Sequence, residues 1–309
     1  MKLTEKTILS TDGVHQLYVR MWIPKGEIRG IFQIVHGMTE HVQRYDPLMQ
    51  TMAQAGFVAF GHNHLGHNTT SPDKDLGFIH EKSGYQYLID DTRKVGKVLS
   101  EEFSGVMHIL FGHSMGSFVV RLAAQDMPID KLIICGTGGP NPASSLGIGV
   151  CKLLKKLYGE RHVSKLVYAL AFGAYNQRFE KESQYDWLSV NRENIRIYSQ
   201  DPYCTFPFTV SAMQDLITLI SLCNRSDWFE AMPKELPIYL IAGAEDPVGD
   251  YGKGVQTVYD RLNENGCFVE MKLYPGMRHE ILNDHCAGEV LADIMAFSCV
   301  VSDKEKISN

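Results

Sequence analysis

The segment Gly112-His113-Ser114-Met115-Gly116 is the strongest chemical signal in the sequence. It lies between a short apolar run and an apolar stretch of helical character, and this strand–turn–helix setting is typical of a nucleophile held on a sharp turn. Gly112 and Gly116 stand two residues on either side of the serine, where a tight turn leaves little room for side chains. The pattern predicts that Ser114 is a nucleophile, raised above a sheet at the positive end of a helix.

A serine hydroxyl is a weak nucleophile at neutral pH, so it needs a general base and a carboxylate that orients that base. When the serine occupies such a turn, the carboxylate comes next along the chain and the histidine last. Asp246 follows a late apolar run, and Pro247 favours an extended backbone at that aspartate, while the neighbouring Glu245 is the alternative. His279 follows the last strand-like run. We therefore predict a triad of Ser114, Asp246 and His279.

Acyl transfer also requires two backbone N–H groups that face the developing oxyanion. Met115, directly after the serine, would supply one of them. Met38 would supply the other from the loop after the first buried apolar run, where Gly37 allows the chain to turn sharply. We expect His36 and His113 to form hydrogen bonds behind the reacting groups. A purely structural role for the Met38 loop is the alternative.

Apolar runs and amphipathic stretches alternate along most of the chain. The strand-like runs are 17–23, 31–35, 57–60, 107–111, 132–135, 238–242 and 268–274, and the helix-like stretches are 45–55, 84–103, 115–126, 251–265 and one that begins near 289. Such alternation predicts an α/β fold with a mostly parallel central sheet flanked by helices.

The alternation stops between residues 141 and 225, where no buried strand is evident. Two amphipathic stripes occur there, at 150–157 and 163–170. We predict a core formed by residues 1–140 and 226–309, with residues 141–225 as a helical insertion. The stripes require an apolar partner. This partner is either the core of the protein or a lipid, as a substrate or as a membrane surface that the insertion contacts transiently.

Composition narrows the classes of function. The chain has 309 residues, a formal net charge of −6, 44% hydrophobic and 21% charged residues, as in an ordinary globular protein. The acidic balance argues against a nucleic-acid partner. No run approaches the ~18 apolar residues of a membrane span, and the N-terminus lacks an apolar signal sequence, which favours a cytoplasmic location. The seven cysteines contain no C-x-x-C pair and are expected to be reduced.

His62, His64 and His67 invite a metal hypothesis. Their spacing fits neither one helical face nor a known zinc pattern. We expect a hydrogen-bonded loop, no metal and no cofactor.

Taken together, the motifs resemble those of the α/β-hydrolase superfamily. Within it, the chain is similar to the bacterial monoacylglycerol lipase and lysophospholipase-like branch, often labelled serine aminopeptidase-like. The resemblance rests on the following segments: His36-Gly37-Met38-Thr39-Glu40-His41, Gly112-His113-Ser114-Met115-Gly116, Asp246-Pro247-Val248 and Arg278-His279-Glu280-Ile281-Leu282-Asn283-Asp284.

The resemblance implies an α/β-hydrolase fold with a helical cap inserted after the sixth strand. It also implies hydrolysis of a carboxylic ester with a medium or long acyl chain, such as a monoacylglycerol or lysophospholipid. Two departures are His62 to Thr69, where the family usually reads D-x-x-G-H-G-x-S, and Met38, where small residues are commoner. A peptidase or amidase of the proline-iminopeptidase kind and a non-catalytic ligand-binding protein are the alternatives. The oligomeric state is left open.

Overall fold

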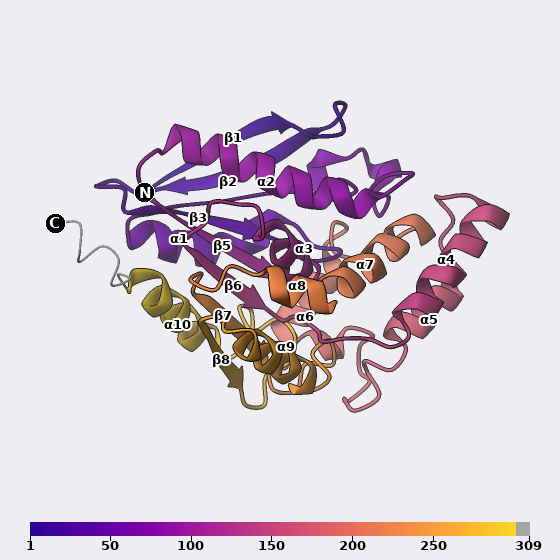
Figure 1. Ribbon diagram of the computed structural model, residues 1–309. Coiled ribbons are helices and arrows are strands. Elements are labelled where there is room, and N and C mark those ends of the chain that lie inside the picture. Colours follow the sequence, from indigo (N-terminus) through magenta and orange to yellow (C-terminus); the bar gives the residue numbers. More distant parts are fainter. Residues whose placement is uncertain (301–309) are drawn as a thin grey trace.

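A single eight-stranded sheet forms the centre of the molecule in the computed structural model, which describes residues 1–300 (Figure 1). The strands are β1 Lys2–Leu9, β2 Gln16–Ile23, β3 Gly30–Val35, β4 Phe57–His62, β5 Met107–His113, β6 Lys131–Cys135, β7 Ile238–Gly243 and β8 Val269–Tyr274. Their order is β1-β2-β4-β3-β5-β6-β7-β8. From β4 to β8, each strand in this order is parallel to its neighbour. The predicted α/β fold with a mostly parallel sheet is confirmed.

The strand β1 is the one element of the sheet that the sequence did not predict. It pairs antiparallel with β2 at the edge of the sheet, and β2 pairs antiparallel with β4. Among the residues of β1 only Ile8 is buried, so its sequence carries little of the apolar pattern that marks the central strands.

Helices cover both faces of the sheet. Those of the α/β core are α1 Asp46–Gln54, α2 Gly84–Glu102, α3 Met115–Ala123, α8 Ser226–Ala231, α9 Lys253–Glu264 and α10 Ala287–Cys299. One apolar cluster joins α1 and α10 to one face, and another joins α2, α3, α8 and α9 to the opposite face. Short 3₁₀ helices occur at η1 Val42–Tyr45, η2 Asn68–Thr70, η3 Asp73–Asp75 and η4 Asp186–Leu188.

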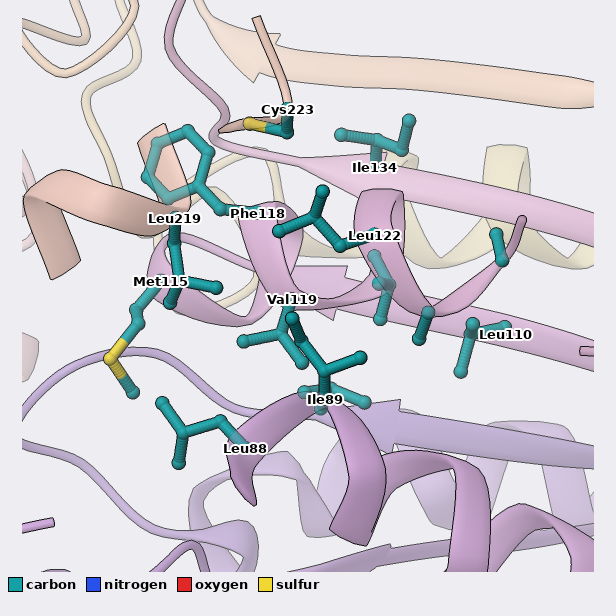
Figure 2. Close-up of a cluster of buried hydrophobic side chains, with 14 of the residues drawn as sticks. Leu88, Ile89, Leu110, Met115, Phe118, Val119, Leu122, Ile134, Leu219 and Cys223 are labelled. Atoms are coloured by element: carbon teal, nitrogen blue, oxygen red, sulfur yellow. The ribbon is translucent and has the colours of Figure 1, made fainter. Parts of the chain in front are cut away.

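Helix α3 begins directly after Ser114 and is fixed in place by its apolar side chains. Figure 2 shows Met115, Phe118 and Val119 of α3 packed between α2 and the sheet, with Leu219 close by. All nine residues of α3 are buried. Removing a buried aromatic side chain such as that of Phe118 costs about 3–5 kcal/mol. This packing holds α3, and with it the turn at Ser114 (the elbow), firmly against the core.

The segment between β6 and β7 contains helices and, within the described chain, no strand. Its helices before residue 226 are α4 Ser144–Tyr158, α5 Lys165–Phe172, α6 Arg192–Gln200 and α7 Val210–Leu222, and α8 of the core follows them. Figure 1 shows α4 and α5 extending away from the sheet, whereas α7 lies against the core, where Leu219 is fully buried. We keep the division into a core of 1–140 and 226–309 and a cap of 141–225 as a proposal.

Candidate active site

Ser114 occupies a strained turn between β5 and α3. Its backbone has φ 53° and ψ −121°, a region that residues other than glycine rarely adopt. The Ser114 N–H donates to the carbonyl of Cys135 on the neighbouring strand β6 at 3.0 Å. The strain is therefore held by the sheet on one side and by the packed helix α3 on the other.

The two glycines of the elbow are required by close packing. A Cβ on Gly116 would lie 2.1 Å from the carbonyl oxygen of Val35 and 2.6 Å from that of His36. A Cβ on Gly112 would lie 2.4 Å from the carbonyl oxygen of Gly116. Each position thus lets two backbone segments approach more closely than any side chain would permit.

The structure brings Asp246 and His279 together from two loops at the carboxyl ends of β7 and β8. Nδ1 of His279 lies 2.8 Å from Oδ2 of Asp246, and both residues are buried. Oδ1 of Asp246 accepts from the N–H of Val248 at 2.9 Å, which fixes the carboxylate. The alternative acid, Glu245, is exposed to solvent. This pairing leaves Nε2 of His279 to act on a proton, as a general base requires.

Ser114 and His279 line the same cavity, which has a volume of about 530 Å³. Met38 and Met115 also line it, so the predicted nucleophile, base and oxyanion donors share one space. Most of the remaining wall is apolar and comes from the cap: Leu146, Val150, Val167, Leu170, Ala171, Phe172, Met213, Leu216, Ile217 and Ile220.

The loop that carries Met38 packs directly against the serine. A Cβ on Gly37 would lie 2.9 Å from Cβ of Ser114, so glycine permits this approach. The backbone N–H groups of Met38 and Met115 donate to no other described residue. Both are therefore available to an oxyanion.

A buried carboxylate holds this loop to the elbow. Glu40 accepts hydrogen bonds from the N–H of Gly37, from the hydroxyl of Tyr45 at 2.8 Å and from Nδ1 of His113 at 3.1 Å. Nε2 of His113 in turn lies 3.3 Å from the carbonyl oxygen of His279. Burial alone would raise the pKa of Glu40, but the hydrogen bond and charge of His113, together with the charge of Arg44 and the hydroxyl of Tyr45, outweigh it and lower that pKa to about 2.

The pKa of His113 moves in the opposite direction. Burial lowers it, but the hydrogen bond and the negative charge of Glu40 raise it above its ordinary value. The two residues therefore form a buried ion pair behind the reacting groups. The expectation that His113 forms hydrogen bonds behind Ser114 matches this arrangement.

Two arginines connect the core to the cap. Arg44 makes a bidentate ion pair with Glu280, at 2.8 and 2.7 Å, and Glu280 also accepts from Asn194 of α6 at 2.7 Å. Nη2 of Arg278 donates to both carboxylate oxygens of Glu180 of the cap, with both distances 2.8 Å. The bidentate pair of Arg44 with Glu280 fixes orientation as well as position.

His36 belongs to a buried group of four histidines with His62, His64 and His67. Its Nδ1 lies 2.8 Å from the carbonyl oxygen of Gly37, and its Nε2 accepts from the N–H of His64 at 3.1 Å. Burial lowers the pKa of His62 and that of His67 to about 4, so the group is uncharged at neutral pH.

The predicted hydrogen-bonded loop is only partly observed. His67 accepts from the N–H of Thr39 at 3.3 Å, whereas neither ring nitrogen of His62 has a partner among residues 1–300. Among the described residues, those whose ligand atoms lie close enough to share a metal ion are not these histidines. They are His41, Asp201 and Cys204, whose ligand atoms all lie within 4.8 Å of one another. Nε2 of His41 there lies 2.9 Å from Oδ2 of Asp201, so the two ligands are already engaged with each other.

Sequence reasoning gave no part in the site to Trp187, which packs on the ring of His279 with centroids 5.2 Å apart. It also assigned no role to Glu40 or Arg44. The motif that contains Glu40 was visible, but only the three-dimensional arrangement shows which atoms this carboxylate contacts.

A mostly parallel sheet with a strained serine elbow after β5 and an Asp–His pair on later loops defines an α/β-hydrolase. The chain belongs to the family described as serine aminopeptidase, S33, whose model matches residues 26–285.

The chain is similar over most of its length to monoacylglycerol lipases. It is 25% identical over 282 residues to monoglyceride lipase from Rattus norvegicus, which covers 88% of this chain and 82% of the rat protein. It is 24% identical over 300 residues to monoacylglycerol lipase from Mycolicibacterium smegmatis, and the match covers 95% of this chain and 96% of the mycobacterial protein. A thermostable carboxyl esterase from Bacillus coagulans, solved in complex with glycerol, superposes with a TM-score of 0.91 at 31% identity and covers 96% of this chain and 98% of its own.

Proposed function

We propose that the chain is a serine hydrolase that cleaves carboxylic esters through an acyl-enzyme on Ser114. The observation that carries this proposal is the buried Asp246–His279 pair in the same apolar cavity as the strained serine. In the proposed reaction, Nε2 of His279 takes the hydroxyl proton of Ser114 as the oxygen attacks the ester carbonyl. The Met38 and Met115 amides stabilise the oxyanion.

The protonated His279 then gives its proton to the departing alcohol, which leaves the acyl group on Ser114. A water molecule, deprotonated by His279, attacks the acyl-enzyme and releases the acid. Asp246 keeps the imidazole in one orientation and stabilises its charged form in both steps.

The charges around the cavity favour a neutral substrate with an acyl chain. The carboxylates that line it are Glu40 and Glu280, and both are already paired, with His113 and Arg44 respectively. No carboxylate of the described lining is therefore left for the ammonium group that an aminopeptidase substrate presents. The lining also contains no lysine or arginine, which a phosphate group would require.

We therefore propose a monoacylglycerol-like ester as the preferred substrate, ahead of a lysophospholipid or a peptide. A medium or long acyl chain would lie along the apolar cap wall. The glycerol bound to the Bacillus coagulans esterase supports the same choice of headgroup.

We further propose transient contact between the cap and a lipid surface. Apolar side chains of α4 and α5 face solvent: Leu146, Leu153, Leu157, Tyr158, Leu166 and Leu170. Leu146 and Leu170 are 72% and 70% exposed and also line the cavity, so the patch is continuous with the proposed acyl site. No helix within residues 1–300 is long and apolar enough to cross a membrane.

The test is active-site labelling combined with substrate profiling. A fluorophosphonate probe should label the wild-type protein but not the Ser114→Ala variant, and His279→Ala should lose several orders of magnitude in turnover. Monoacylglycerols should be hydrolysed faster than lysophosphatidylcholine and aminoacyl amides. Absence of both labelling and ester turnover would leave the non-catalytic alternative, and preference for an aminoacyl amide would replace the esterase with a peptidase.

A further inference from the structure

The cap contributes an aromatic wall to the candidate general base. The imidazole of His279 contacts the ring of His113, with centroids 4.8 Å apart, and the indole of Trp187, with centroids 5.2 Å apart. His113 belongs to the elbow, whereas Trp187 belongs to η4 of the cap. The base thus contacts one ring from each part of the molecule.

The turn that carries Trp187 is attached to the histidine loop on both sides. Arg278, directly before His279, donates to the carbonyl oxygen of Asp186 at 2.6 Å. The N–H of Glu280, directly after His279, donates to the carbonyl oxygen of Leu188 at 2.7 Å. The residues that flank the indole are therefore bonded to the residues that flank the imidazole, which fixes the two rings against each other.

Trp187 is also held from within the cap. Its backbone N–H donates to Oδ1 of Asn176 at 2.9 Å, and its ring packs on Tyr175 with centroids 5.0 Å apart. Tyr175 in turn contacts Phe172 at the end of α5, the helix whose outer face is exposed and apolar. The position of the indole consequently depends on the fold of the cap and not on the core alone.

We propose that Trp187 is a positioning residue for His279, which it holds in place and whose protonated form it stabilises through the face of the indole. This inference rests on the proposed function, because it requires that His279 accept the proton of Ser114. An imidazolium forms in both halves of that reaction, and an aromatic face within about 6 Å attracts a cation. The cap would then complete the catalytic machinery as well as form the substrate cavity.

The other charged groups near His279 do not supply this stabilisation through an aromatic face. Asp246 bonds Nδ1 at the ring edge, and the charge of His113 is balanced by Glu40. The side chains of Arg278 and Glu280 are directed to their own partners, Glu180 and Arg44. Trp187 is therefore the aromatic contact of His279 that carries no charge and no competing ion pair.

The kinetic test compares Trp187→Phe with Trp187→Leu on p-nitrophenyl acetate, a small ester that leaves most of the cavity unfilled. Loss of the aromatic face in Trp187→Leu should lower the pKa on the acidic limb of kcat/KM by about 0.4–0.7 units and reduce kcat roughly three- to tenfold. Trp187→Phe should restore most of both. An unchanged kinetic pKa in a folded Trp187→Leu variant would overturn the proposal.

A fluorescence titration without substrate separates this inference from the proposed function. Because a protonated imidazole quenches a neighbouring indole, part of the intrinsic fluorescence should titrate with His279. That part should disappear in Trp187→Phe and in His279→Ala but persist in Trp22→Phe, the matched control. A folded wild-type protein that shows the titration but no ester turnover would refute the proposed function. Turnover without any Trp187-dependent titration would refute the contact.

Discussion

Replacing Glu40 by glutamine should destabilise the protein, although the side chain lies outside the predicted triad. The carboxylate is 3% exposed and accepts from Gly37, Tyr45 and His113. Glutamine keeps the shape and an acceptor oxygen for the Gly37 N–H, but it removes the negative charge that His113 faces. The variant therefore isolates the charge of the pair from its hydrogen-bonding geometry.

The expected loss follows from the pKa of Glu40. Its decrease from 4.5 to about 2 corresponds to about 3 kcal/mol of stability at neutral pH, since one pKa unit is worth about 1.4 kcal/mol. Removing one partner of a buried ion pair typically costs about 3–5 kcal/mol, which agrees with that value. Because the pKa is lowered on folding, the contribution is complete above pH 4.5 and is lost as the pH falls towards 2.

His113 adds a limit on the alkaline side. Its pKa is raised on folding, so its contribution is complete below its ordinary value of 6.5 and is lost as the pH rises through the raised value. The difference in stability between wild type and Glu40→Gln should therefore be largest between roughly pH 5 and pH 6.5.

Urea unfolding at pH 3, 6 and 9 measures this difference directly. We expect the free energy of unfolding of the two proteins to differ by about 3 kcal/mol at pH 6. The difference should fall below about half of that value at pH 3, and it should also be smaller at pH 9 than at pH 6. Glu193→Gln is the matched control, because it breaks the exposed pair with Arg196 and should leave stability unchanged. A difference below about 1 kcal/mol that does not vary with pH would refute the ion pair between Glu40 and His113.

Three further predictions concern the elbow, the histidine group and the cap. Gly116→Ala should cost about 3 kcal/mol in urea unfolding and abolish fluorophosphonate labelling, because its Cβ would overlap the Val35 carbonyl; a stable, labelled variant would contradict this. The wild type should lose stability between pH 6.5 and 4, because the low pKa of the buried His62 means that only the unfolded chain takes up its proton in that range. His62→Leu should make this loss about 3 kcal/mol smaller, as measured by urea unfolding at the two pH values. Leu157→Glu, on the exposed face of α4 and outside the cavity lining, should weaken co-sedimentation with phosphatidylcholine vesicles by about tenfold or more while p-nitrophenyl acetate turnover stays unchanged, and equal vesicle binding would argue against the cap surface.

The parts of the fold that follow local rules could be predicted from the sequence. The buried runs such as 107–111 and 238–242 correspond to β5 and β7, because strands covered on both faces are apolar throughout. The stretch 84–103 corresponds to α2 within one residue, because its apolar positions repeat with the helical period. At the edge strand β1, where one residue is buried, that signal is absent.

The candidate site divides in the same way. The order of Ser114, Asp246 and His279 could be predicted from the serine turn, and their shared position from the parallel strands, whose carboxyl ends lie at one edge of the sheet whatever the distance along the chain. The contacts of Glu40 and Trp187 could not be predicted. They depend on side chains 73 and 92 residues away in the sequence, and no periodicity records such pairs.

These non-local contacts meet at His279. From the core, the Glu40–His113 pair supports the loop through the His279 carbonyl. From the cap, Arg278 and Glu280 bind the carbonyls on either side of Trp187. A displacement of the cap turn would therefore disturb the base as well as the substrate wall, which would make the position of the cap a condition for proton transfer. On this reasoning, cap substitutions near η4 should lower kcat even for short esters, whereas those on the outer faces of α4 and α5 should affect only the encounter with lipid.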